Sequence, residues 1–186
     1  MKPERLVGAI ALMTLVFTIL FWAVMYFGTL PYIRADAGGL EPLELRLGGY
    51  TPDEARQFLV ALGGEGRAFY RGVQLVVDAI FPLTYASTLS LGAFLLTIGR
   101  LSCRRVPAAL CNWGPVVIAF AAMLLDYREN FLLIDMLDMQ PDAVSDALAA
   151  SASLMTRLKA SLLAVLLAII AVYIVRAVVL LRRRPA

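Results

Sequence analysis

Histidine is absent from this chain of 186 residues, and cysteine occurs only twice. The absence of histidine excludes most zinc sites, histidine-ligated haem and catalytic schemes in which an imidazole moves a proton. Cys103 and Cys111 do not form a CxxC pair, and they lie beside a basic segment that we assign below to the cytoplasm. Thiols in that compartment are kept reduced, so we expect two reduced thiols. We predict neither a metal site nor a cofactor.

Charged residues are also scarce, at 17% of the chain, whereas hydrophobic residues make up 61%. Four long apolar segments contain most of the hydrophobic residues, and each is long enough to span a membrane. That is more apolar surface than a soluble core of this size needs. The net charge of +3 comes mainly from basic residues beside the apolar segments. Because no basic patch with interleaved aromatic residues accompanies them, nucleic acid is not an expected partner.

We therefore predict an all-α polytopic membrane protein, in which residues 1–186 form a single four-helix transmembrane bundle with a small extracytoplasmic cap. The four spans are predicted at about 6–30, 73–99, 106–126 and 160–181. Residues 31–66 form the extracytoplasmic loop, and residues 127–159 form outward helix extensions and their connection. A cleaved signal peptide is the alternative for the first span, because Ala35-Asp36-Ala37 resembles a cleavage site. The apolar run is about twice the roughly 7–15 residues of a signal core, which favours a retained helix.

Basic residues beside the spans predict the orientation of the bundle. The segment 100–105 contains Arg100, Arg104 and Arg105 and no acid, and residues 182–184 are three further arginines. The loops at 31–66 and 138–153 are mixed in charge or acidic. Since Lys and Arg accumulate in cytoplasmic segments, both termini are predicted to be cytoplasmic. The expected localisation is the bacterial inner (plasma) membrane, crossed several times.

The loop after the first span contains a strong helix start. In Thr51-Pro52-Asp53-Glu54, the threonine can cap the helix, the proline suits its first position, and the acids face the positive end of its dipole. Phe58, Leu59 and Leu62 then form one apolar face, and Gly63-Gly64 end the helix. We expect this short amphipathic helix to lie on the membrane surface or to roof the bundle. Upstream, leucines at 43, 45 and 47 alternate with polar residues, a pattern typical of a short strand.

The second span carries a polar stripe in an otherwise apolar sequence. Its members recur at steps of three, four and seven, which places them on one helical face: Arg71, Gln74, Asp78, Tyr85, Thr88 and Gly92. Asp78 is costly in a membrane helix, so we expect it to face the other helices and to pair with Lys159, Arg157 or Arg71. Pro82 should kink the helix and free the carbonyl of Asp78, either as an ordinary packing kink or as part of a site.

Counting residues along the predicted spans places polar residues that are distant in the sequence at the same depth in the membrane. A hydrocarbon core takes about 20 helical residues at about 1.5 Å each. Counting outward from the basic clusters puts Asp78, Asp126 and Lys159 at the outer edge of the bilayer, with further polar residues just above them. The candidate ligand-binding layer therefore consists of Arg71, Gln74, Asp78, Tyr85, Asp126, Glu129, Asn130, Arg157 and Lys159.

Four interpretations of this layer remain open. It can be an ion-pair network that fastens the helices. It can be a pocket for a lipid head group or small polar molecule, with Arg71, Arg157 and Lys159 binding an anion. It can be the site of a lipid-active enzyme, with Asp78 and Asp126 or Glu129 as acid and base or as ligands of a hard cation. An ion pathway is disfavoured, because the inner halves of the second and third spans carry no charge.

Three short segments together resemble a pattern in small uncharacterised bacterial four-helix integral membrane proteins: Gly66-Arg67-x-x-Tyr70, Asp78-x-x-x-Pro82-x-x-Tyr85 and Asp126-x-x-Glu129-Asn130. The resemblance covers about residues 50–159 and implies the same architecture. Those proteins have no assigned activity, so the resemblance implies no reaction.

The expected function is binding without catalysis, by an integral inner-membrane protein whose polar layer faces outward. Its expected partners are membrane lipids and a membrane protein or a second copy of the chain. The alternative is a membrane enzyme that acts on a lipid or isoprenoid substrate through paired carboxylates. No nucleophile motif, glycine-rich phosphate loop or metal-spaced cluster accompanies those carboxylates, so the sequence leaves catalysis open.

Overall fold

The computed structural model describes residues 3–97 and 107–182, which are mainly helical. Over these residues there is no strand, and four helical stretches are long and apolar enough to cross a membrane. The stretches are Arg5–Asp36, Pro52–Thr97, Ala108–Asp138 and Asp146–Leu180. The predicted all-α class and the four apolar helices are thus confirmed.

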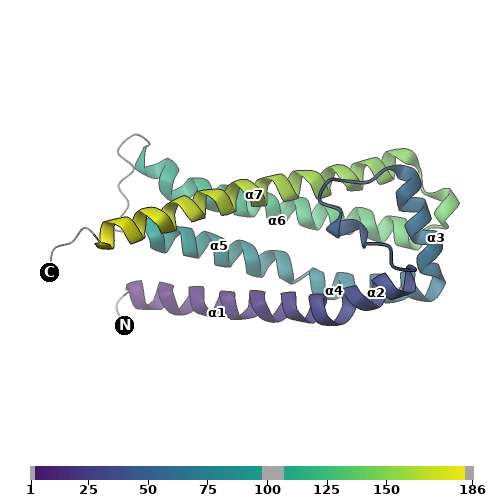
Figure 1. Cartoon of the computed structure of the whole chain (residues 1–186), viewed down its shortest axis with the longest axis horizontal. Helices are drawn as coiled ribbons and strands as arrows, with labels where there is room; N and C mark the ends of the chain where they lie inside the picture. Colours follow the sequence, from purple (N-terminus) through teal and green to yellow (C-terminus); the bar gives the residue numbers. More distant parts are fainter. Residues whose placement is uncertain (1–2, 98–106, 183–186) are drawn as a thin grey trace.

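The chain runs up and down along one long axis (Figure 1). The first stretch is α1 (Pro3–Val24), the π-helical turn η1 (Met25–Thr29) and α2 (Leu30–Asp36). The second stretch is α3 (Pro52–Phe69), the π-helical turn η3 (Tyr70–Gln74), α4 (Leu75–Asp78) and α5 (Phe81–Thr97). The last two stretches are the long helices α6 (Ala108–Asp138) and α7 (Asp146–Arg182). The start of α1 and the end of α7 lie at one end of the bundle, and α3 lies at the other (Figure 1).

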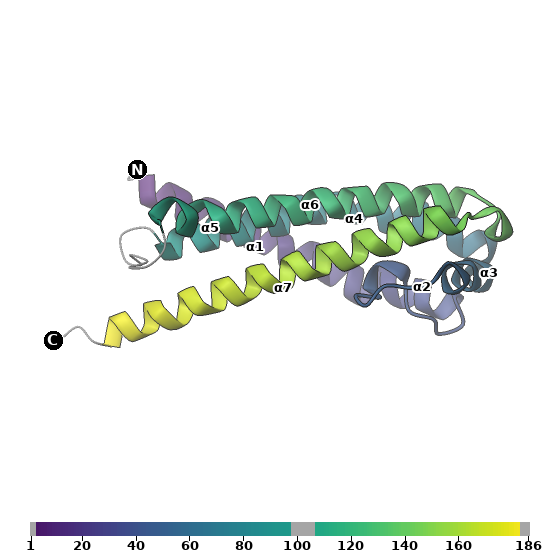
Figure 2. The ribbon, with the colours of Figure 1, turned by 90° about the horizontal axis from the view of Figure 1, so that it is seen from above.

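Neighbouring helices pack in the order α1, α5, α6, α7. Figure 2 shows that α7 diverges from α6 towards the end of the chain. Large apolar side chains point outward from all four stretches, including Leu12, Leu83, Val117 and Val175, each more than half exposed. Such extensive exposed apolar surface is typical of helices that contact lipid, because water would penalise it.

The end of the bundle at α3 carries a folded cap, by which we mean α3 together with residues 37–51. The predicted start of α3 is confirmed, because the Glu54 backbone N–H donates to Thr51 Oγ1 (3.2 Å) and the Thr51 N–H donates to Glu54 Oε2 (2.6 Å). Gly63 breaks the helical path with a φ of 67°, a left-handed value that favours glycine. The helix thus turns direction at the residues where it was predicted to end.

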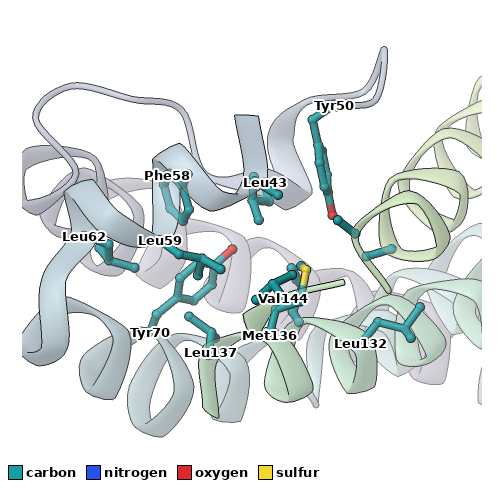
Figure 3. Close-up of a cluster of buried hydrophobic side chains, with 14 of the residues drawn as sticks. Leu43, Tyr50, Phe58, Leu59, Leu62, Tyr70, Leu132, Met136, Leu137 and Val144 are labelled. Carbon is teal, nitrogen blue, oxygen red and sulfur yellow. The ribbon is translucent and has the colours of Figure 1, made fainter. Parts of the chain in front are cut away.

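A buried apolar cluster joins the cap to the ends of α6 and α7 (Figure 3). Phe58, Leu59 and Leu62, which form the predicted apolar face of α3, are buried in this cluster, so that face packs on the bundle. They meet Tyr70 of η3 and residues of α6 such as Met136 (Figure 3). The cap is therefore a packed roof over the bundle.

One prediction for the first loop is wrong, and the first helix extends beyond its predicted span of about 6–30. The helix continues past Pro31 to Asp36, and Pro31 follows the π turn and lies in the first turn of α2. At that position its missing N–H is not needed. The alternating residues form no strand; Leu43–Leu45 is a single 3₁₀ turn that buries Leu43 and Glu44.

The second apolar stretch is interrupted as expected near Pro82. The break lies at residues 79–80, between α4 and α5, and Pro82 lies in the first turn of α5. A proline there removes no N–H that the helix needs. The third helix, α6, runs without a break to Asp138, as the sequence indicated.

The prediction of reduced thiols is wrong for Cys111, which is disulfide-bonded. The prediction rested on the compartment assigned to the neighbouring loop, and the sequence does not give distances between sulfur atoms. Cys103 and the basic segment 100–105 lie outside the described residues.

Candidate functional site

Polar side chains from three helices meet just below the cap. Lys159 of α7 lies between two carboxylates of α6, with its Nζ 2.9 Å from Asp126 Oδ1 and 2.5 Å from Glu129 Oε2. Tyr85 of α5 donates a hydrogen bond to Asp126 Oδ2 (3.0 Å). Thr156 donates to Glu129 Oε1 (2.6 Å). All four carboxylate oxygens therefore have a partner, and we call these five residues the Lys159 cluster.

The Lys159 cluster is almost fully buried. The exposed fractions of the Lys159, Asp126 and Glu129 side chains are 11%, 5% and 0%. Asp126 and Glu129 lie three residues apart and so share one face of α6, which lets one ammonium group bridge them. Removal of one member of such a buried group would leave an uncompensated charge, which is strongly destabilising. The intact cluster therefore holds α5, α6 and α7 in contact.

Asp78 lies beside this cluster at the end of α4. It is buried as predicted, and its Oδ2 accepts a hydrogen bond from Asn130 Nδ2 (2.8 Å). The predicted charge pair with Lys159, Arg157 or Arg71 is wrong: in the described part of the chain, no Lys or Arg lies within ion-pair distance of Asp78. The reason is that Lys159 is already held by the two carboxylates of α6.

Glu44 is a buried site residue that the sequence analysis missed. Gln74 accepts a short hydrogen bond from Thr29 through its Oε1, and its Nε2 donates towards Glu44 Oε1 at 3.5 Å. Glu44 Oε2 is buried and has no hydrogen-bond partner among the described residues. Burial, followed by the negative charge of Asp78, raises the pKa of Glu44 to about 8. The alternating pattern around Glu44 resembled a half-exposed strand, so no sequence signal pointed to its burial.

Two predicted members of the polar layer lie elsewhere. Arg71 pairs with Asp138 on the surface, with Nε 2.5 Å from Oδ1 and both side chains 49% exposed. It lies in the π turn η3, where the spacing that should align it with Gln74 and Asp78 does not hold. Arg157 is exposed, since residues two apart on a helix do not share a face and Lys159 points inward.

A cavity of about 790 Å³ opens beside these groups, between α1 and α2 on one side and α5 and α7 on the other. Its polar lining includes five predicted residues and Glu44. They are Glu44, Gln74, Asp78, Tyr85, Asp126 and Lys159. Glu129 and Asn130 lie behind this lining and contact it through Lys159 and Asp78.

The remaining cavity wall is mainly apolar. Leu89 of α5 and Leu163 and Leu167 of α7 line the part farther from the cap, and Trp22 and Phe27 line the α1 side. Near the cap, Arg34 and Glu41 also contribute to the lining and form a half-exposed ion pair, with Nη2 2.5 Å from Oε2. The cavity is therefore polar at one end and apolar along its length.

The described residues contain no group of three or more His, Cys, Asp or Glu side chains that could hold a metal ion. Comparison with protein families, curated proteins and solved structures finds no match for this chain. The geometry of the cavity and of its polar groups therefore provides the basis for a functional proposal.

Proposed function

We propose that this protein is an integral membrane protein that binds a lipid in the cavity between α1, α5 and α7 without catalysing a reaction on it. The observation that carries the proposal is the order of residues along the cavity. On α7, Lys159 is followed one turn later by Leu163 and two turns later by Leu167. On α5, Tyr85 is followed by Leu89.

The polar-to-apolar order runs along the helix axes. At about 1.5 Å per residue, Leu167 lies about 12 Å from Lys159 along α7. A lipid bound with its head group below the cap would therefore place its acyl or isoprenoid chain beside the leucines. The concave shape favours a lipid over a protein partner, because a protein–protein interface is usually a broad surface.

The contacts of the carboxylate oxygens favour lipid binding over the alternative of a lipid-active enzyme. A carboxylate that exchanges protons with a substrate needs an accessible oxygen within hydrogen-bond distance of it. Asp126 and Glu129 already use their oxygens on Lys159, Tyr85 and Thr156. The predicted acid–base pair of Asp78 with Asp126 or Glu129 would have to break this buried cluster.

A cavity-filling variant tests the proposal. We expect the wild-type protein, purified in mild detergent, to retain a lipid that native mass spectrometry detects as a discrete added mass. Leu163→Trp should lose that lipid, because the indole fills the apolar part of the cavity. Leu124→Trp is the matched control, since Leu124 is 63% exposed on α6 and outside the cavity lining. Equal retention by all three proteins would contradict the proposal.

We propose further that the protein spans the bacterial inner membrane with both termini in the cytoplasm and the cap outside. The described start of α1 and end of α7 lie at one end of the bundle, which supports placing the termini on one side (Figure 1). The disulfide of Cys111 lies near that same end and counts against this orientation, because cytoplasmic thiols are usually reduced. A reporter active only outside the cytoplasm should be active at position 145 and silent at the carboxyl end. The reverse pattern would overturn the orientation.

A further inference from the structure

We infer that the cavity selects a lipid whose head group carries a primary ammonium, bound by Asp78 and Glu44. This inference rests on the proposed lipid-binding function and names the ligand's chemical class. Three observations carry it: the charges that line the cavity, the unpartnered oxygen of Glu44, and the positions of the arginines.

The first observation is an excess of carboxyl groups in the cavity. Glu44, Asp78 and Asp126 line it, and the ammonium of Lys159 is shared between Asp126 and Glu129. Asp78 has a single hydrogen-bond donor, Asn130, among the described residues, and no cation in contact. An ionised carboxylate at this depth is costly without a cation, so a ligand cation would be bound most favourably beside Asp78.

The second observation is the unsatisfied oxygen of Glu44. This side chain is more than nine-tenths buried and lines the cavity, yet its Oε2 has no partner among the described residues. Its other oxygen has a donor at the long distance of 3.5 Å, from Gln74. A primary ammonium has three N–H donors, enough to reach both Glu44 and Asp78. A trimethylated ammonium has none, so it would leave both carboxyl groups without a hydrogen bond.

The third observation is that the arginines expected to bind an anion are not inside the cavity. Arg71 and Arg157 lie on the surface. Arg34 lines the cavity on its cap side, where it is half-exposed and paired with Glu41. A head group that carries only a phosphate would therefore face the carboxyl groups and be repelled. A zwitterionic head group can place its ammonium at Asp78 and its phosphate towards Arg34.

The test is competition between lipids of identical acyl chains, measured by native mass spectrometry on the full-length protein in detergent. The probes are dioleoyl phosphatidylethanolamine, phosphatidylcholine, phosphatidylglycerol and diacylglycerol. We expect the ethanolamine lipid to be retained about tenfold more than each of the others, which corresponds to about 1.4 kcal/mol. A preference for phosphatidylglycerol, or equal retention of the ethanolamine and choline lipids, would overturn the inference while lipid binding itself stands.

Variants then assign the preference to particular side chains. Asp78→Asn and, as a second independent variant, Glu44→Gln should each lower the ethanolamine preference several-fold while other lipids still bind. Asp142→Asn removes the same charge from an exposed residue outside the cavity and should change nothing. An unchanged preference in whichever of the two cavity variants folds would overturn the assignment.

Two further results separate this inference from the function on which it rests. If none of the lipids is retained above the level of Leu163→Trp, the proposed lipid-binding function fails. Free ethanolamine, added without acyl chains at millimolar concentration, should not raise the thermal stability. If it did so as well as the lipid, the ammonium chemistry would stand, but the ligand would be a small amine.

Discussion

The Lys159 cluster and the carboxyl groups of Glu44 and Asp78, which we call the Glu44–Asp78 pair, both contribute to the cavity lining, yet they differ in how their oxygens are used. In the cluster, every oxygen of Asp126 and Glu129 has a cation or a hydroxyl as partner. In the pair, one donor serves Asp78, and one oxygen of Glu44 has no partner among the described residues. The difference teaches that buried charge alone does not mark a site, because a satisfied group stabilises the fold and an unsatisfied one can accept a ligand.

Substitution of Lys159 should give the largest effect, because it orphans two buried carboxylates. We expect Lys159→Met to lower the free energy of unfolding by about 3–5 kcal/mol, measured by SDS titration in mixed micelles. Arg71→Met is the matched control at an exposed ion pair and should cost less than about 1 kcal/mol. Adding Asp126→Asn and Glu129→Gln to Lys159→Met should restore part of the loss. Equal losses for the two single variants would contradict a fastening role for the cluster.

Tyr85→Phe should give a smaller loss within the same cluster. It leaves Asp126 Oδ2 buried without its hydroxyl donor, which should cost about 1–3 kcal/mol in the same titration. Tyr127→Phe is the matched control, because Tyr127 directly follows Asp126 on α6 and is partly exposed. It should leave the free energy of unfolding almost unchanged. A neutral Tyr85→Phe would show that Asp126 is satisfied by Lys159 alone.

Asp78→Asn should lower stability by less than about 1 kcal/mol, although it removes a buried charge. The asparagine oxygen can still accept from Asn130, and the change relieves repulsion from the neighbouring carboxylates. The charge pair predicted from the sequence would have made this substitution destabilising, but that pair does not form. A loss as large as that of Lys159→Met would move Asp78 from the ligand-binding pair to the fastening cluster.

The last prediction concerns the pH dependence of stability that Glu44 causes. Its pKa is about 8 in the folded protein against an ordinary value of 4.5. Between these values the folded state holds a proton that the unfolded chain releases, so stability should fall as pH rises from about 4.5 to about 8. Glu44→Gln should flatten this slope, whereas Glu65→Gln, at an exposed residue, should leave it in place. Thermal unfolding at a series of pH values measures both slopes.

The elements that the sequence predicted correctly depend on local physics. Apolar length identified the four helices, and the Thr51 capping box identified the start of α3. Counting residues along helices placed Asp126 and Lys159 at one level, where they form an ion pair. Such arguments succeed because helical rise and capping are set by the nearest residues.

The features that the sequence did not predict depend on contacts between distant segments. Glu44 is buried because its 3₁₀ turn packs against α7 and its side chain approaches Gln74 of η3, and nothing within the loop itself requires this. Arg71 left the polar stripe because the π turn changed the helical spacing. The sequence also did not predict which carboxylates pair with Lys159. The rotation of α6 about its axis determines that Asp126 and Glu129 face α7.

The two π turns, η1 and η3, contact each other and are joined by the hydrogen bond between Thr29 and Gln74. Each π turn contains one residue more than an α turn, and one residue rotates a helix by about 100°. The two halves of the first helix are thus phased independently, one half towards lipid and the other towards the cap. Deletion of a single residue from η1 would convert the π turn into ordinary α-helix. It would rotate α1 about its axis by about 100° relative to α2. This rotation would move Trp22 away from the cavity while the cap remained folded. The number of residues in η1 therefore determines the shape of the cavity.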